Sequence, residues 1–298
     1  MTADAAPTAA YNAVLRSANG AQTLTEIAGS SGCSVADVAA AAQDLFHHGV
    51  VTDAAREPVP ALSYFWHATA VARWSSVRRA PQEQPATVMS IQGARDRRLL
   101  LGLLIEEYFM VSSAPVHISA GVAHAPSERM QLMLSEYLAE EYSHGLWLRQ
   151  GLVAAGLSER DLAQMVPLPG TTAVINFLRV TASTDTLAYG ICLSFHELAK
   201  TEERVAWIRT AYDRLVDLDL FPEAALAPSR DHLLEDVEAD HASLCEEFFA
   251  DVPALSVQQQ DALMKTAVSY AHTLHEYMLS VGRFYREPDG PRYLGLEA

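Results

Sequence analysis

The chain has 298 residues, half of them apolar, a formal net charge of −16 at pH 7 and only three cysteines. This length accommodates one large domain, or a medium one with a small appendage. The acidic balance argues against nucleic acid or an anionic membrane as the main partner, because both attract basic surfaces. Three scattered cysteines cannot form a disulfide framework, and residues 1–10 lack the pattern of a secretory signal, so we expect a cytoplasmic protein.

The first part of the chain predicts a small helical unit over residues 11–56. Its last helix runs into Gly49 and two valines, which resembles the helix-to-strand exit of winged-helix domains, including peptide-docking domains of natural-product pathways. Only Arg16 and Arg56 are basic there, so DNA contact is not expected. We predict a winged-helix-like N-terminal domain over 1–80, which either docks a peptide or carrier protein, contacts a second copy, or is inert.

Residues 86–298 follow a proline-flanked linker and carry helical apolar periodicity without a strand pattern. An all-α fold is therefore predicted, with a helical bundle as its main body. The apolar run from Leu99 meets a glutamate after seven residues, too early for a membrane span. Residues 114–126 are predicted to be a loop, in which His117 and His124 form ordinary hydrogen bonds. The predicted bundle helices are 88–113, 128–151, 158–164, 171–181, 186–218, 231–249 and 256–285, and another, 61–79, lies on the main body.

The segment 128–150 contains the most informative pattern. Glu141 and His144 fall on its apolar stripe, together with Met130, Leu134, Tyr137 and Leu148. A carboxylate and an imidazole are costly to bury without a partner. Their position therefore predicts that other helices supply groups to the same place.

Three further segments carry polar groups in apolar surroundings. They contain the adjacent pair Glu106 and Glu107, then Glu197, and then Glu238 with His241. One Glu from each of two helices and one Glu-x-x-His from each of two others is the ligand set of di-iron and di-manganese bundles. Four carboxylates also balance the charge of two divalent cations, and mixed oxygen and nitrogen ligands favour iron or manganese over zinc. Periodicity does not decide between Glu106 and Glu107.

Two other histidine pairs are weaker candidates. His232 and Asp236 have a plausible ligand spacing, but the register that turns Glu238 inward predicts that both face solvent. His272 and His275 lie off the main apolar stripe of the last helix, so a helix flank is the expected place for them. They remain the alternative site, for instance as axial ligands of a haem.

The order of several short motifs, which covers roughly residues 90–285, resembles the haem-oxygenase-like di-iron oxidases, also described as iron-containing redox enzymes. The motifs are Glu106-Glu107-Tyr108, Pro115-Val116-His117-Ile118-Ser119, Glu140-Glu141-Tyr142-Ser143-His144, Pro167-Leu168-Pro169-Gly170-Thr171, Leu187-Ala188-Tyr189 ending at Glu197, and Glu238 to His241. Many members carry a further histidine one turn before the last acidic ligand, where this chain has Leu234. The resemblance implies a haem-oxygenase-like bundle that holds two Fe(II) ions, with the ligands Glu106, Glu141, His144, Glu197, Glu238 and His241.

The function implied by the resemblance is a dioxygen-dependent oxidation of a small organic substrate, such as an amino acid, an amine or an aliphatic acid. The outcome would be desaturation, carbon–carbon cleavage or N-oxygenation in specialised metabolism, and a homodimer is expected. Two alternatives keep the bundle without the metal. One is a thiaminase-like or quinone-synthase-like enzyme, and the other is a ligand-sensing regulator.

Overall fold

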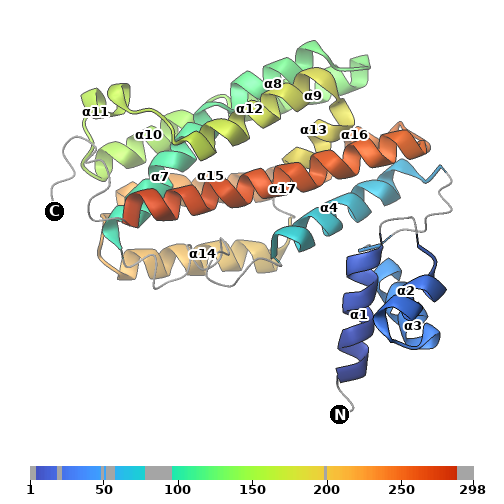
Figure 1. The fold of residues 1–298 in the computed structure, drawn as a ribbon. Helices are drawn as coiled ribbons and strands as arrows, with labels where there is room; N and C mark the ends of the chain where they lie inside the picture. Colours follow the sequence, from blue (N-terminus) through green and yellow to red (C-terminus); the bar gives the residue numbers. More distant parts are fainter. Residues whose placement is uncertain are drawn as a thin grey trace.

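The computed structural model describes residues 5–18, 22–47, 50–51, 58–77, 96–197 and 200–286. Helices account for nearly all of these ranges (Figure 1). Within them, the only strand-like feature is an isolated antiparallel bridge between Val59 and Leu255. The predicted all-α fold class is thereby confirmed.

Three short helices with their own small hydrophobic core form the N-terminal unit. A capping box between Thr23 and Glu26 starts the second helix, and Val50 donates a backbone hydrogen bond to Leu45 at the end of the third. Residues 52–57, where a wing would follow, lie outside the described residues, so the winged-helix assignment stays a prediction. The helices are α1 (Ala5–Ser17), α2 (Leu24–Ser31) and α3 (Val35–His47).

The remaining helices form the bundle around α17, a helix of 30 residues that contacts α4, α7, α12 and α13 (Figure 1). As expected, the helix after the N-terminal unit, α4, lies on this body: Phe65 belongs to the bundle core, and the Tyr64 hydroxyl donates to the Gln260 carbonyl at 2.6 Å. The bundle helices are α4 (Ala61–Val77), α7 (Arg97–Ser112), α8 (Ala114–Ala123), α9 (Glu128–Glu141), α10 (His144–Ala154), α11 (Glu159–Gln164), α12 (Pro169–Thr184), α13 (Thr186–Leu193), α14 (Glu202–Asp217), α15 (Glu223–Ala239), α16 (His241–Ala250) and α17 (Val257–Arg286).

Three predicted helices are interrupted in the structure. The helical conformation is interrupted at Tyr142 and Ser143 between α9 and α10, at Asp240 between α15 and α16, and in a turn after α13. Asp240 adopts the left-handed conformation, with φ of 58°, which aspartate tolerates better than most residues. The breaks place predicted ligands at helix ends, where a side chain can approach the bundle centre from the terminus of its helix.

The predicted loop 114–126 is wrong, because residues 114–123 form α8. Pro115 lies in the first turn of this helix, where the lack of an N–H group costs nothing. The helix buries His117 against the bundle, whereas His124 at its end is exposed.

One segment of the described chain, Arg97–Ala123, is long and apolar enough to cross a membrane by composition alone, with a mean hydropathy of 1.5. Such a segment is weak evidence, because buried core helices have the same composition. Here it consists of two helices, α7 and α8, that contribute Leu99, Leu101 and Ile118 to the hydrophobic cores. We therefore interpret it as part of the bundle interior.

Candidate metal centre

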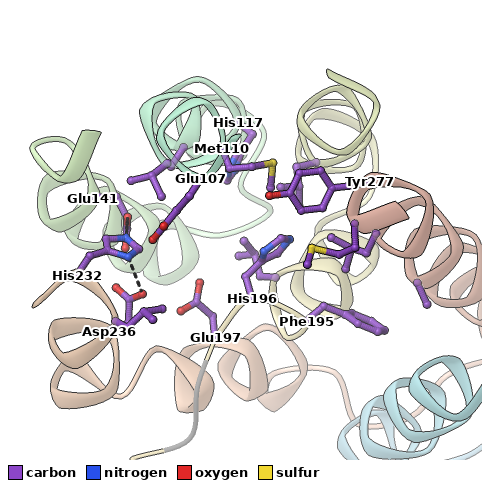
Figure 2. Close-up of a pocket in the computed structure, with 18 of the residues that line it drawn as sticks. Glu107, Met110, His117, Glu141, Phe195, His196, Glu197, His232, Asp236 and Tyr277 are labelled. Carbon is purple, nitrogen blue, oxygen red and sulfur yellow. Dashed lines mark ion pairs between the residues drawn. The ribbon is translucent and has the colours of Figure 1, made fainter. Parts of the chain in front are cut away.

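A cavity of about 440 Å³ lies inside the bundle, between helices α7, α8, α9, α12, α15 and α17 and the turn after α13. Figure 2 shows that Glu107, Glu141, His232 and Asp236 gather on one side of it, whereas Met110, Phe195 and Tyr277 lie on the other. The candidate site is the polar side, where Glu141, at the end of α9, is almost completely buried.

Glu141 accepts a hydrogen bond from Nδ1 of His144 at 3.0 Å, and its carboxylate lies 4.0 Å from Nε2 of His232. His232 in turn places Nδ1 3.6 Å from the Asp236 carboxylate. These four residues offer one ligand atom each within 4.8 Å of one another, and all four are buried. Burial alone would raise the pKa of Glu141, but the hydrogen bond from His144 and the nearby imidazole of His232 outweigh it and lower that pKa to about 2.

His241, the first residue of α16, extends the cluster. Its Nδ1 lies 3.3 Å from Glu197, 3.5 Å from Glu141 and 3.8 Å from Asp236, yet makes no hydrogen bond. Its Nε2 is hydrogen-bonded to Glu140 at 3.0 Å, an arrangement that orients metal-binding histidines in many proteins. A neutral imidazole in this orientation would aim a lone pair at three carboxylates, so the position requires either a proton or a metal cation.

The structure corrects the predicted register of α15. Glu238 is exposed, whereas His232 and Asp236, which were expected to face solvent, are only 7% and 6% exposed and line the cavity. The reason is that the helix is interrupted at Asp240. His241 belongs to α16, so its position on the apolar face of α16 does not predict which face of α15 is buried. With Asp236 as the acidic residue, the histidine one turn earlier is His232, and the imidazole that seemed to be missing at Leu234 is present.

The structure also distinguishes the two glutamates on α7. Glu106 is fully buried outside the cavity, where it accepts hydrogen bonds from the Leu168 amide, the Thr171 hydroxyl and the Tyr285 hydroxyl. Glu107 lines the cavity, and both of its oxygens lie 2.7 Å from the Ser229 hydroxyl. Glu106, the expected ligand, is thus engaged in joining α7 to α12 and α17, and Glu107 is the carboxylate of α7 that faces the cluster.

This difference predicts opposite behaviour for two adjacent substitutions. Glu107→Gln is expected to lower the metal content of the protein and to leave its melting temperature nearly unchanged in the metal-free state. Glu106→Ala is expected to retain the metal but lose about 3 kcal/mol of stability or more, because three donors lose their acceptor. Metal analysis, thermal unfolding and urea unfolding of both variants check this, and loss of metal in the Glu106 variant alone would contradict it.

The group of residues fits two divalent cations. Four carboxylates, from Glu107, Glu141, Glu197 and Asp236, balance two doubly charged ions, and the imidazoles of His144, His232 and His241 supply nitrogen ligands. Oxygen-rich sets with a few imidazoles suit iron or manganese. Without a cation, the buried cluster has to take up protons, on the imidazoles of His232 and His241 and on Asp236.

His275 was expected on a helix flank, but it is buried and lines the cavity, so that expectation is wrong. His272, its neighbour one turn earlier on α17, does not line it. Of the predicted ligands, the structure brings together Glu141, His144, Glu197 and His241. The spacing of His232 and Asp236, one helical turn apart, was the signal that could have identified the remaining two on α15.

No known protein-family model matches the sequence, and no curated protein matches it either. Solved structures do. One is a domain of unknown function with a haem-oxygenase-like fold from Shewanella denitrificans, at a TM-score of 0.55 and 15% identity. Another is a TenA homologue from Pseudomonas syringae pv. tomato, at a TM-score of 0.52 and 16% identity. Each match covers 75% of this chain and 93% of the other, and they show that the chain has a haem-oxygenase-like fold.

Proposed function

We propose that the protein is a non-haem di-iron oxidase that uses dioxygen to oxidise a small organic substrate. The observation that carries the proposal is the unbonded Nδ1 of His241, which three carboxylates surround inside the bundle. Buried carboxylates and imidazoles in this arrangement are stable together when cations lie between them. The haem-oxygenase-like fold and its cavity supply the scaffold.

The proposed ligands divide into two neighbouring sets. Glu141, His144, His232 and Asp236 would hold one iron, and Glu107, Glu197 and His241 would contribute to the second site. When bound, the iron pair supplies the electrons that reduce dioxygen.

Neighbouring residues orient these ligands and shape the site. The hydroxyl of Tyr137 donates to Glu197 at 2.7 Å, and Glu140 holds the ring of His241. Both contacts restrict ligand rotation. Apolar side chains on the far side, including Met110 and Phe195, exclude water, and a volume of about 440 Å³ limits the substrate to a small molecule.

Anaerobic titration of the metal-depleted protein with Fe(II) tests the proposal. We expect about two iron ions per chain, as the ligand set predicts, followed by a transient visible absorption when dioxygen is admitted. Glu141→Gln should lose both responses, because this carboxylate contacts three of the imidazoles. Glu136→Gln is the control for the loss of a charge on the same helix, because this side chain is exposed. Wild-type protein that binds no iron under these conditions would contradict the proposal.

A metal-free acid–base enzyme is the second candidate, since the fold is shared with a TenA homologue. The observation in its favour is the hydrogen-bonded pair of Tyr137 and Glu197 at the cavity wall. In that case Fe(II) would leave the melting temperature unchanged. A rise of several degrees with Fe(II) favours the oxidase, because only ligands that bind the folded state stabilise it.

A further inference from the structure

Two histidines line the part of the cavity towards Tyr277 in Figure 2, and each is paired with a tyrosine. Nδ1 of His117 lies 2.7 Å from the hydroxyl of Tyr189, and Nε2 of His196 is hydrogen-bonded to the hydroxyl of Tyr270. Both tyrosines are completely buried, and both histidines line the cavity. Each imidazole therefore has one nitrogen fixed by the protein and one nitrogen left over.

The direction of these hydrogen bonds follows from the tyrosines. Among the described residues, neither hydroxyl has another hydrogen-bonding partner, so each must donate its proton to the imidazole. The reverse direction would leave a buried O–H unsatisfied, at a cost of about 1–3 kcal/mol. The remaining nitrogens, Nε2 of His117 and Nδ1 of His196, consequently carry hydrogen. Protonation of either ring would leave these N–H groups in place.

A third donor lies on the same side. Figure 2 shows the ring of Tyr277 with its hydroxyl directed into the cavity, towards Met110. No described residue forms a hydrogen bond with this hydroxyl. The only arginine or lysine among the described lining residues is Arg73, whose guanidinium carbon lies 5.5 Å from the centre of the Phe195 ring. This side of the cavity thus offers hydrogen-bond donors with a cation nearby.

Burial, followed by the charge of His196, lowers the pKa of His117 to about 3, so His117 is neutral, and both imidazoles line the same cavity. The cavity that these donors line also has apolar side chains, among them Met110, Leu274 and Met278, and it reaches the carboxylate cluster. A ligand inside it would therefore meet the donors, apolar side chains and the carboxylate cluster.

From this arrangement we infer that the substrate is a small aliphatic carboxylic acid whose carboxylate binds to His117, His196 and Tyr277, away from the metal, so that its hydrocarbon part extends towards the cluster. The inference rests on the proposed function for the identity of that cluster. A carboxylate offers two oxygens with about four acceptor positions, enough for three donors. An ammonium group or an alcohol at this place would find only the Tyr277 oxygen as an acceptor, because both histidine nitrogens donate.

Octanoate, octylamine and octanol are suitable probes, because they differ only in the head group. Their binding is to be measured by calorimetry on metal-depleted protein and, without dioxygen, on Fe(II)-loaded protein. We expect octanoate to bind at least about tenfold more tightly than the other two, in line with one or two hydrogen bonds to a charged group. His117→Leu should weaken octanoate binding by a similar factor and leave the iron content unchanged.

Tyr189→Phe separates this role from a purely structural one. It keeps the imidazole but frees its tautomer, so the preference for octanoate over octylamine should fall even where the protein is equally stable. Tyr64→Phe is the matched control, since it also removes a buried hydroxyl but lies outside the cavity, and it should leave the preference unchanged.

Three results decide between the possibilities. Equal binding of octanoate and octylamine by the wild type overturns the inference. Octanoate binding that needs Fe(II) and is insensitive to His117→Leu also overturns it, because the carboxylate then binds the metal. A preference for octanoate that depends on His117 in a protein that takes up no iron supports the inference while contradicting the oxidase proposal.

Discussion

Asp236→Ala is expected to abolish tight iron binding, lowering the affinity by at least about 100-fold, the upper end of the effects measured for residues that merely support ligands. The Asp236 carboxylate lies 3.6 Å from His232 and 3.8 Å from His241, so it is placed to contribute to both metal positions. The metal-free variant should still fold. Burial, with the nearby charges of Glu197 and Glu141, raises the pKa of Asp236 to about 7. The ionised carboxylate therefore destabilises the folded metal-free protein.

Glu238→Ala is the matched control, because it removes a carboxylate two positions away on the same helix. Its side chain is exposed, so iron content and melting temperature should both match those of the wild type. Iron per chain after anaerobic loading, together with far-ultraviolet circular dichroism to check folding, measures the difference. If iron were lost from the Glu238 variant and retained by the Asp236 variant, the ligand set read from the structure would be wrong.

The periodicity of apolar residues was sufficient to predict the all-α fold class and part of the candidate site. Apolar stripes predicted the helices, and the polar residues misplaced on those stripes led to Glu141, His144, Glu197 and His241, which the structure brings together. Such a pattern is informative because burying a charged group without a partner is costly. A residue that interrupts an apolar stripe therefore indicates a site more reliably than its type alone does.

The remaining proposed ligands could not be identified from the periodicity of apolar residues. Because Asp240 adopts a left-handed conformation, α16 does not continue the helical register of α15. The buried face of α15 therefore carries Asp236 and not Glu238. Neighbouring positions such as Glu106 and Glu107 differ by only about 100° around a helix, and both lie among apolar residues. Hydrogen-bond donors from Leu168, which precedes α12, and from Tyr285 on α17 hold Glu106 away from the cavity. Both donors are distant from Glu106 in the sequence.

The hydrogen-bond donors His117 and His196 were missed for a related reason. Pro115 suggested a loop, although proline is well placed in the first turn of a helix, and the error removed His117 from the bundle interior. No local pattern could identify the tyrosines that fix the two imidazoles, because each pair joins segments about 70 residues apart. Long-range contacts of this kind come only from the packed structure.

In the metal-free protein, the free energy of unfolding is expected to fall as the pH rises from about 6.5 to 9. Burial lowers the pKa of His232 and of His241, but Glu141 and Glu197 outweigh it and raise both from 6.5 to about 9. A histidine with a raised pKa in the folded state stabilises fully below 6.5, and this contribution is lost as the pH rises through 9. A shift of this size is worth about 3 kcal/mol for either ring.

Asp236 acts in the same direction, because its pKa of about 7 in the folded state means that ionisation between 3.8 and 7 is unfavourable to folding. Glu141 acts in the opposite direction at acid pH: its stabilisation is present above 4.5 and is lost as the pH falls towards 2. Together, these four groups stabilise the metal-free protein most at about pH 4, by the linkage between proton binding and folding.

Bound Mn(II), used in place of Fe(II) to avoid oxidation, should reverse the alkaline trend. A metal ion replaces the protons on His232 and His241, so its stabilising effect grows as the pH rises and fewer protons have to be displaced. Urea unfolding between about pH 6 and 8.5, with and without Mn(II), measures this difference. His124→Gln, which changes an exposed histidine, should retain the full slope, and His232→Gln should reduce it. If the free energy of unfolding of the metal-free protein did not change with pH across this range, the imidazoles of the cluster would not carry the protons that the geometry requires, and the prediction would be wrong.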